Sequence, residues 1–184
     1  MIDLLTLEKD FIRPHVKEGG VVVDFTMGNG HDTLFLSNTV KESGHVYAFD
    51  IQEGALVSTK KRLETEGSYE NYTLIHDSHH NLKKYIDRKI KAGMFNLGYL
   101  PGSNNKALTT KRETTLPAVK DALDMLDSDG ILLIAVYPGH AEGEVEGKLL
   151  LEYFETIDRH EMSVSKFQIV NSPTSPYFFI CEKK

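Results

Sequence analysis

The sequence has little cysteine, no excess of positive charge and no long apolar run, and each shortage excludes a class of protein. Cys181 is the only cysteine among 184 residues, so one chain can form neither a disulfide framework nor a cysteine zinc site. No segment has the length of a membrane span or the basic-then-apolar pattern of a signal peptide. With 40% hydrophobic residues, we expect one cytoplasmic domain over 1–184, with a single core that includes the cysteine.

The charge balance limits the kinds of partner. The chain has 21 lysine and arginine residues and 27 aspartate and glutamate residues. The formal net charge of -6 argues against a protein that coats nucleic acid through bulk electrostatics. Local basic clusters remain candidates, although such clusters are more often solvated helix faces. They are Lys83–Lys84, Arg88–Lys91 and the group Lys106, Lys111 and Arg112.

The most informative segment is a β-branched run followed by a glycine-spaced turn. Val21–Val23 predicts a buried strand, Gly28 and Gly30 follow it, and a helix signal opens at Asp32, which is the strand–loop–helix corner that nucleotide cofactors use. Glycines there let the backbone approach a ligand closely, and the helix start presents free N–H groups. Asp50, 20 residues after Gly30, closes a second predicted strand, where a carboxylate can accept from both ribose hydroxyls of an adenosine.

This corner favours one nucleotide cofactor over another. Position 33 is threonine, so the third glycine of the dinucleotide fingerprint is missing. A pyrophosphate prefers a bare helix start, whereas Asp32 would repel it and could instead accept from the ammonium of an amino-acid moiety. The corner therefore favours S-adenosylmethionine over NAD; the alternative is a glycine turn in some other α/β protein.

Helical and extended patterns alternate along the whole chain, which predicts an α/β fold with a mostly parallel sheet. Five strands with crossover helices and a terminal pair match the seven-stranded, Rossmann-like sheet of class I methyltransferases, whose last strand is antiparallel and whose cofactor lies over the carboxyl ends of the strands. The expected strands are 21–25, 45–50, 72–76, 94–100, 130–137, 162–170 and 177–182. The expected helices are 4–12, 32–41, 53–66, 80–91, 114–126 and 143–159.

Polar residues also follow the third and fourth predicted strands. Past the third strand, Asp77 could accept from the adenine amino group, and the three histidines of 76–80 suggest a metal site as the less favoured alternative. At the fourth, Asn96, Tyr99 and Pro101 resemble a spread-out form of the Asn/Asp-Pro-Pro-aromatic signature of amino-group methyltransferases. Such a site needs a polar acceptor for the amine and a wall beside the sulfonium, although an ordinary buried strand and turn is the alternative.

Three motifs together resemble one small family, that of the "putative rRNA methylases". They are Asp24-x-Thr26-x-Gly28-Asn29-Gly30-His31-Asp32-Thr33, the segment 96–102, and Tyr137-Pro138-Gly139-His140 with Gly143 and Glu146. The resemblance implies a class I enzyme that uses S-adenosylmethionine to methylate the aminomethyl group of the tRNA wobble uridine. Its partner would then be the tRNA anticodon stem-loop.

The candidate site residues fall into three groups. The candidate cofactor contacts are Asp24, Thr26, Met27, Gly28, Asn29, Gly30, Asp32, Thr33, Asp50, Gln52, Asp77, Ser78, His79 and Asn96. The candidate substrate contacts are Tyr99, Pro101, Lys106, Lys111, Arg112, Tyr137 and His140. Asn96, Tyr99 and His140 are the candidate catalytic residues, because each could receive a hydrogen bond from the amine.

The residues independently limit the acceptor atom. Enzymes that methylate carbon 5 of a pyrimidine commonly use a cysteine nucleophile, and none lies near the fourth strand. The acceptor should therefore be a nitrogen or an oxygen. Ribosomal RNA or a small amine is the alternative substrate, and a nucleotide-binding module without catalysis or an NAD-dependent oxidoreductase is the alternative class. We also expect that a small acidic domain could pair as a homodimer.

Overall fold

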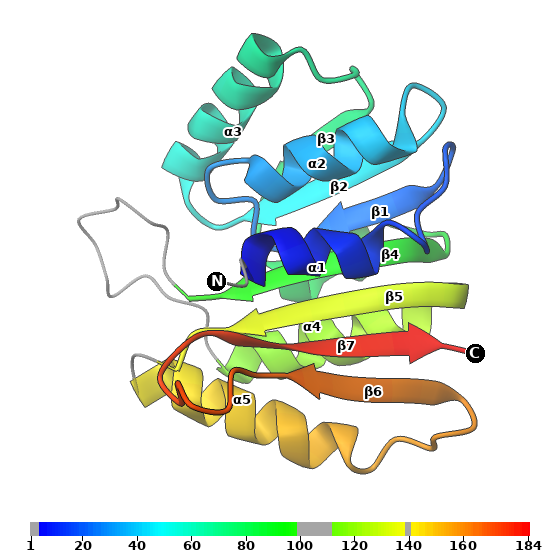
Figure 1. Ribbon diagram of the computed structural model, residues 1–184. Coiled ribbons are helices and arrows are strands. Elements are labelled where there is room, and N and C mark those ends of the chain that lie inside the picture. Colours follow the sequence, from blue (N-terminus) through cyan, green and yellow to red (C-terminus); the bar gives the residue numbers. More distant parts are fainter. Residues whose placement is uncertain (1–3, 99–111, 139–140) are drawn as a thin grey trace.

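The computed structural model describes residues 4–98, 112–138 and 141–184, which form a seven-stranded sheet with helices on both faces (Figure 1). The strand order is β3-β2-β1-β4-β5-β7-β6. The strands are β1 (Val21–Asp24), β2 (His45–Asp50), β3 (Tyr72–His76), β4 (Ile90–Leu97), β5 (Leu126–Val136), β6 (Met162–Phe167) and β7 (Tyr177–Lys183). The helices are α1 (Leu4–Ile12), α2 (His31–Val40), α3 (Glu53–Glu66), the 3-10 helix η1 (His79–Lys84), α4 (Arg112–Met125) and α5 (Ala141–Phe154).

The sheet topology confirms the predicted fold class. Strands β1 to β5 pair in parallel, whereas β7 is inserted between β5 and β6 and runs antiparallel to both. The carboxyl ends of β1 to β5 therefore lie along one edge of the sheet, which we call the carboxyl edge (Figure 1). Loops that follow these strands meet there, as the sequence motifs require.

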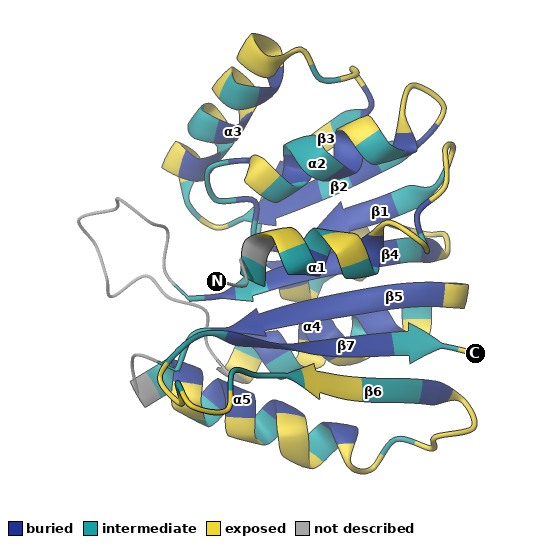
Figure 2. Cartoon of the chain, viewed as in Figure 1, coloured by how far each residue is buried: buried dark blue, intermediate teal, exposed yellow. Residues whose placement is uncertain are grey.

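Alternation along the central strands explains why both faces of the sheet are covered. On β1, Val22 packs with Leu36 of α2 and Ile12 of α1, whereas Val23 points to the opposite face, toward α4 and η1. A parallel strand buried on both faces reads as a continuous apolar run, which is the Val21–Val23 pattern. The central strands are accordingly almost wholly buried (Figure 2).

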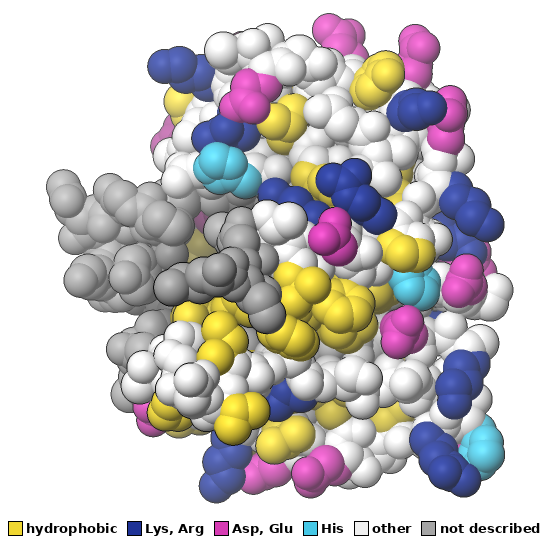
Figure 3. Space-filling model, viewed as in Figure 1, with side chains coloured by type: hydrophobic (Ala, Val, Ile, Leu, Met, Phe, Trp, Pro, Cys, Tyr) yellow, Lys and Arg dark blue, Asp and Glu magenta, His cyan; other side chains and the backbone are white. Residues whose placement is uncertain are grey.

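The surface over α1 and α2 carries charges of both signs. Lysine and arginine side chains alternate with aspartate and glutamate side chains over this face, without a large region of one sign (Figure 3). No helix in the described part of the chain combines the length and the apolar character needed to cross a membrane.

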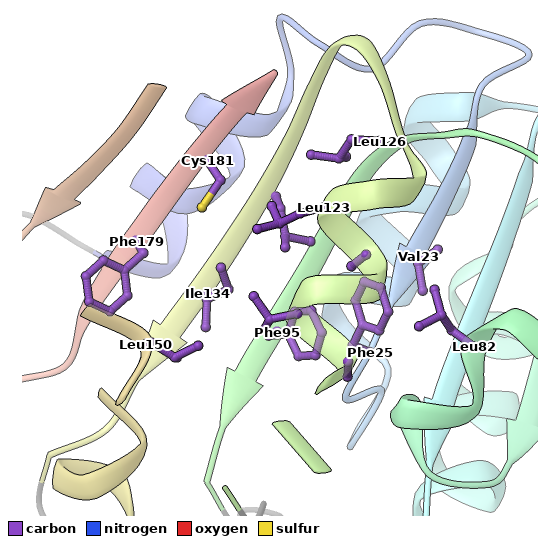
Figure 4. Close-up of a cluster of buried hydrophobic side chains, with 14 of the residues drawn as sticks. Val23, Phe25, Leu82, Phe95, Leu123, Leu126, Ile134, Leu150, Phe179 and Cys181 are labelled. Carbon is purple, nitrogen blue, oxygen red and sulfur yellow. The ribbon is translucent and has the colours of Figure 1, made fainter. Parts of the chain in front are cut away.

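The larger of the two main core clusters lies between the sheet and the helices α4 and α5. Phe25 stacks on Phe95 with ring centroids 4.0 Å apart, and Leu123 of α4 packs in the same cluster (Figure 4). Cys181 of β7 is fully buried there, as expected for a core cysteine. Stacked phenylalanines at the ends of β1 and β4 hold these two strands together directly beneath the carboxyl edge.

Several predicted elements are wrong or displaced. The helix expected over 80–91 is a six-residue 3-10 helix, and β4 begins at Ile90 instead of residue 94. Ile90 and Ala92 are buried and Lys91 between them is half-buried, which is the alternation of a strand. The sequence suggested a helix because the lysines around Ile90 resemble the polar face of an amphipathic helix. The last predicted helix, 143–159, also ends earlier, at Phe154.

Candidate active site

Asp24 ties the first loop of the carboxyl edge to the helix that follows it. Its Oδ1 accepts from the backbone N–H of Thr26 at 3.1 Å, and its Oδ2 accepts from the hydroxyl of Thr33 at 2.6 Å. Asp24 is fully buried, and this burial, together with the nearby Asp32 carboxylate, raises its pKa from 3.8 to about 7. Asp24 and Thr33, both predicted as cofactor contacts, therefore bind each other and shape the loop.

The two glycines of this loop are required by its backbone and by its neighbour α3. Gly28 has φ of 49° and Gly30 has φ of 79°, both in the left-handed region that favours glycine. A Cβ on Gly30 would lie 2.9 Å from the Cα of Thr59, and the Thr59 hydroxyl donates to the Gly28 carbonyl at 3.1 Å. The loop is therefore pressed against α3 and presents bare backbone at the carboxyl edge.

Asp50 closes β2 and connects it to the same loop. Its Oδ2 accepts from the N–H of Gly28 at 3.1 Å and its Oδ1 from the N–H of Gln52 at 3.0 Å. Burial raises the pKa of Asp50, and these N–H donors oppose the rise. An ionised carboxylate has about four acceptor positions, so these backbone donors do not use all of its capacity to accept from a ligand such as a ribose diol.

Two further predicted contacts in the first loop are held by their backbone. Met27 is buried, and its N–H donates to the carbonyl of Phe49 at 2.9 Å. The Asn29 carbonyl accepts from Nε of Arg62 on α3 at 2.7 Å. Sequence reasoning missed Arg62, because an arginine on a charged helix face carries no local signal of the loop that it reaches.

The segment after β3 is tied to η1 by the Asp77 and Ser78 side chains. Asp77 Oδ1 accepts from the N–H of Ser78 at 2.7 Å and from Asn81, and its Oδ2 accepts from the Tyr85 hydroxyl at 2.9 Å. His80 Nδ1 pairs with the Ser78 hydroxyl at 2.8 Å. Asp77 and Ser78 thus lie at the carboxyl edge, as predicted, and also stabilise the start of η1.

The three histidines of 76–80 do not converge. His76 bonds to the carbonyl of Ile51 at 3.0 Å, and His79 Nδ1 donates to the carbonyl of Phe25 at 3.2 Å. His79 is buried with its ring edge against Phe95, and burial lowers its pKa to about 4, so the ring is neutral. Its Nε2 has no hydrogen-bond partner among the described residues. Their different partners give no support to a metal site here.

Asn96 forms hydrogen bonds with residues from three other elements of the carboxyl edge. Its backbone N–H donates to the Thr26 hydroxyl at 2.8 Å, and its side-chain Nδ2 donates to Asp32 Oδ2 at 2.8 Å. The Tyr137 hydroxyl donates to Asn96 Oδ1 at 3.4 Å. The fold therefore brings together four predicted residues, from the loop after β1, α2, β4 and the segment after β5.

Two observations complete this cluster. Burial raises the pKa of Tyr137 to about 12, with smaller contributions from the Glu8 and Asp32 charges, so its phenol stays protonated. The ammonium of Lys9 on α1 lies 3.5 Å from Asp32 Oδ1. Sequence reasoning missed Lys9, which precedes the motif by many residues and follows no recognisable pattern.

Several predicted residues fall outside the described part of the chain. They are Tyr99, Pro101, Lys106, Lys111 and His140. Arg112 begins α4. Their predicted roles stay predictions.

A ligand that carries both an adenosine and an amino acid fits what is described of this edge. The edge offers a carboxylate with unused acceptor positions at Asp50, bare backbone at Gly28 and Gly30, and an amide–carboxylate pair at Asn96 and Asp32. Phosphate groups would meet the carboxylates of Asp32 and Asp50, which disfavours a dinucleotide.

Known proteins are similar to this chain over most of its length. A "tRNA (mnm(5)s(2)U34)-methyltransferase, chloroplastic" of Arabidopsis thaliana is 34% identical over 179 residues, which cover 92% of this chain and 65% of that protein. The chain therefore spans less than two thirds of that relative.

Solved structures are similar in both sequence and fold. A "putative rRNA-methylase" from Clostridium thermocellum has a TM-score of 0.95 and 38% identity, covering 100% of this chain and 99% of that one. A "putative methyltransferase" from Streptococcus mutans, in complex with SAH, has a TM-score of 0.90 and 37% identity over 100% of this chain and 99% of its own. The family described as "Putative rRNA methylase" matches residues 46–183. The chain thus belongs to this family of methyltransferases, with S-adenosylmethionine as the methyl donor.

Proposed function

We propose that this protein methylates the 5-aminomethyl group of the wobble uridine in tRNA and so produces 5-methylaminomethyl-uridine. The observation that carries the proposal is the Asn96 side chain at the carboxyl end of β4. Its amide nitrogen is held by Asp32, and its carbonyl oxygen, which accepts from the Tyr137 hydroxyl, has a second lone pair that can accept a hydrogen bond from an amine. The similarity to the Arabidopsis thaliana protein, whose name specifies a modified uridine at position 34 of tRNA, supports the same substrate.

The residues of the carboxyl edge divide the binding of the methyl donor among them. Asp50 would accept from the ribose hydroxyls, Asp77 from the adenine amino group, and the Gly28–Gly30 backbone would lie against the amino-acid end. When bound, S-adenosylmethionine supplies the methyl group. The donor's positive charge and lack of phosphate suit an edge that carries the carboxylates of Asp32 and Asp50.

The acceptor amine must be neutral to attack the methyl group. An aliphatic amine has a pKa near that of lysine, about 10, so it arrives protonated and must lose that proton to solvent. Asn96 Oδ1 would then accept one N–H of the neutral amine and turn its lone pair toward the methyl group. Tyr137, with its pKa at about 12, acts as a hydrogen-bond donor to Asn96 and not as a base. Alignment of the two reactants can lower the activation free energy of methyl transfer by roughly 7–11 kcal/mol.

The only cysteine is poorly placed to serve methylation of a pyrimidine carbon. Cys181 pairs with Leu132 in the middle of β5, away from the carboxyl edge, and burial raises the pKa of its thiol. A buried, protonated thiol is not a nucleophile. The acceptor is therefore a nitrogen or an oxygen, and the aminomethyl nitrogen fits Asn96.

The substrate is tested by offering the purified protein three RNAs with S-adenosylmethionine. They are an anticodon stem-loop with 5-aminomethyl-uridine at the wobble position, the same stem-loop with uridine, and ribosomal RNA. Nucleoside mass spectrometry should find 5-methylaminomethyl-uridine from the first RNA alone. Equal methylation of both stem-loops would reject the proposal, and methylation of ribosomal RNA alone would favour the activity that the family description names.

Two variants separate donor binding from methyl transfer. Asp50→Ala should weaken S-adenosylmethionine binding by about 1.5–3 kcal/mol for each charge-assisted hydrogen bond lost. Asn96→Ala should instead lower kcat much more than it raises the Kd of the donor, because its contact with the amine matters most in the transition state. Calorimetry gives the Kd and single-turnover kinetics give the rate. Near-normal turnover by Asn96→Ala would show that the β4 end is structural.

A further inference from the structure

The N-terminal helix contributes a charged side chain to the carboxyl edge. Lys9 of α1 places its ammonium 3.5 Å from Asp32 Oδ1, with the two side chains 26% and 13% exposed. The Lys9 ammonium also lies 5.5 Å from the centre of the Phe35 ring on α2. This ion pair is half-buried between two helices, so solvent screens it less than a surface pair.

The second oxygen of Asp32 determines how the Asn96 amide is turned. Asp32 Oδ2 accepts from Asn96 Nδ2 at 2.8 Å. An ionised carboxylate can only accept, so the amide nitrogen must face Asp32 and the amide oxygen must face away from it, where the Tyr137 hydroxyl donates to it. If the Asp32 carboxylate were lost or moved, the amide would be free to turn its nitrogen toward the substrate.

We infer that Lys9 and Asp32 are a pair of positioning residues that hold the Asn96 amide with its carbonyl oxygen toward the acceptor amine. The inference rests on the proposed function for the amine, but its geometric part concerns this chain alone. Lys9 is needed because the Asp32 carboxylate is close enough to Asp24 to act on its charge, and a cation beside Oδ1 holds the carboxylate in place while Oδ2 accepts from Asn96. Asp32 thus acts through Asn96, whereas the sequence motif alone suggested that it binds the donor's ammonium.

The first test removes the charge of Lys9 and keeps its apolar stem. Lys9→Met can still pack on Phe35 but cannot pair with Asp32. With donor and RNA saturating, we expect kcat to fall about 10-fold and the Kd of S-adenosylmethionine to change less than about 2-fold, because a misplaced catalytic group slows the reaction by up to about 10²-fold. Lys9→Arg, which restores a cation, should recover most of the rate.

Arg13→Met is the matched control. The Arg13 guanidinium lies 5.0 Å from the same Phe35 ring, but its ion pair is with Asp10, at 3.8 Å. This variant therefore removes a neighbouring cation without touching Asp32, and its kcat should equal that of the unmodified protein. An equal loss of rate in Arg13→Met and Lys9→Met would overturn the inference, because general charge or helix stability would then explain both.

The second test asks whether the pair acts through Asn96. Lys9→Met should lower kcat in the unmodified protein but should lower it no further in an Asn96→Ala background, since there is no amide left to orient. Asp32→Ala should behave in the same way. A full additional loss in the Asn96→Ala background would overturn the inference, as would an Asp32→Ala variant whose only defect is a weaker Kd for the donor.

A measurement without any RNA separates this inference from the proposed function. The urea midpoints of Asp32→Ala, Asn96→Ala and the double variant form a cycle, and non-additive shifts are expected for residues in contact. If the aminomethyl stem-loop is not methylated but the cycle is non-additive, the proposed substrate fails and the pairing stands. Additive shifts would overturn the pairing whatever the substrate proves to be.

Discussion

At the scale of single residues, Asp24 is the most unusual titratable group of the carboxyl edge. Its carboxyl group is fully buried, lies near two other aspartates, and has a pKa of about 7 instead of 3.8. A protonated carboxyl can keep both of its hydrogen bonds, with its carbonyl oxygen accepting from Thr26 and its O–H donating to Thr33 Oγ1. Near neutral pH the loop is therefore held by a group that exchanges a proton with solvent.

This raised pKa makes stability depend on pH in a defined direction. Between pH 4 and 7 the folded chain binds a proton at Asp24 that the unfolded chain does not, so the contribution to stability is complete below pH 4 and is lost as the pH rises to about 7. Asp24→Asn cannot titrate. The difference in unfolding free energy between the unmodified protein and Asp24→Asn should change by on the order of 1 kcal/mol per pH unit in this window. Urea titrations measure it, and a constant difference would contradict the raised pKa.

At the scale of elements, the contact between α5 and β7 is unusually close. A Cβ on Gly147 of α5 would clash with the hydroxyl oxygen of Tyr177 and would lie 3.1 Å from Cγ1 of Val136 and 3.3 Å from the Tyr177 ring carbon Cζ. Tyr177 begins β7 and pairs with Val136, at the carboxyl end of β5. Gly147 therefore allows a helix interior to approach the strand beside the candidate active site.

The effect of a Gly147 substitution on the free energy of unfolding should depend on whether residue 177 carries a hydroxyl. Gly147→Ala gains helix propensity of about 1 kcal/mol but meets the Tyr177 hydroxyl, and overpacking costs typically about 1–3 kcal/mol, so the single variant should be less stable. In a Tyr177→Phe background the hydroxyl is gone, and the same substitution should become neutral or stabilising. Urea unfolding of the four proteins measures this reversal. An equal loss in both backgrounds would rule out the hydroxyl contact as the cause.

The elements also show what local sequence can and cannot predict. The strand β1, the glycine turn and Asp50 were predictable because their signals lie within a few residues and depend on backbone chemistry. The start of β4 was not predictable, because the lysines around Ile90 make its strand alternation resemble a polar helix face. Lys9 and Arg62 reach the edge from helices far along the chain, and only the packing of α1 and α3 brings them to Asp32 and Asn29. Motifs thus predicted residues that the fold brings together at the carboxyl edge, whereas partners supplied by tertiary packing were missed.

At the scale of the whole molecule, an acidic protein that binds RNA needs an unneutralised basic region. Several described lysines do not provide one, because Lys83 pairs with Asp121, Lys91 pairs with Asp127 at 2.9 Å, and Lys89 donates to the carbonyl of Asp124 at 2.8 Å. These contacts join η1 and β4 to α4 and the start of β5, so they serve the fold. The mixture of charges over the face with α1 and α2 offers no basic surface either (Figure 3).

The remaining basic cluster lies in the chain between Asn96 and the body of α4. Lys106, Lys111 and Arg112 follow the strand whose end carries the candidate acceptor of the amine, and we expect them to hold the phosphates that flank the wobble base. Replacing all three by glutamine should weaken binding of the anticodon stem-loop and reduce the slope of log K against log salt by roughly 2, because each phosphate contact in a single strand contributes about 0.7. The Kd of S-adenosylmethionine should not change.

The matched control replaces Lys83, Lys89 and Lys91 by glutamine, which removes the same amount of charge. These lysines are already bound to protein groups, so the slope of log K against log salt should stay nearly unchanged. Filter binding over a salt series measures both slopes, and equal reductions would mean that net charge, and not the segment after β4, determines the affinity for RNA.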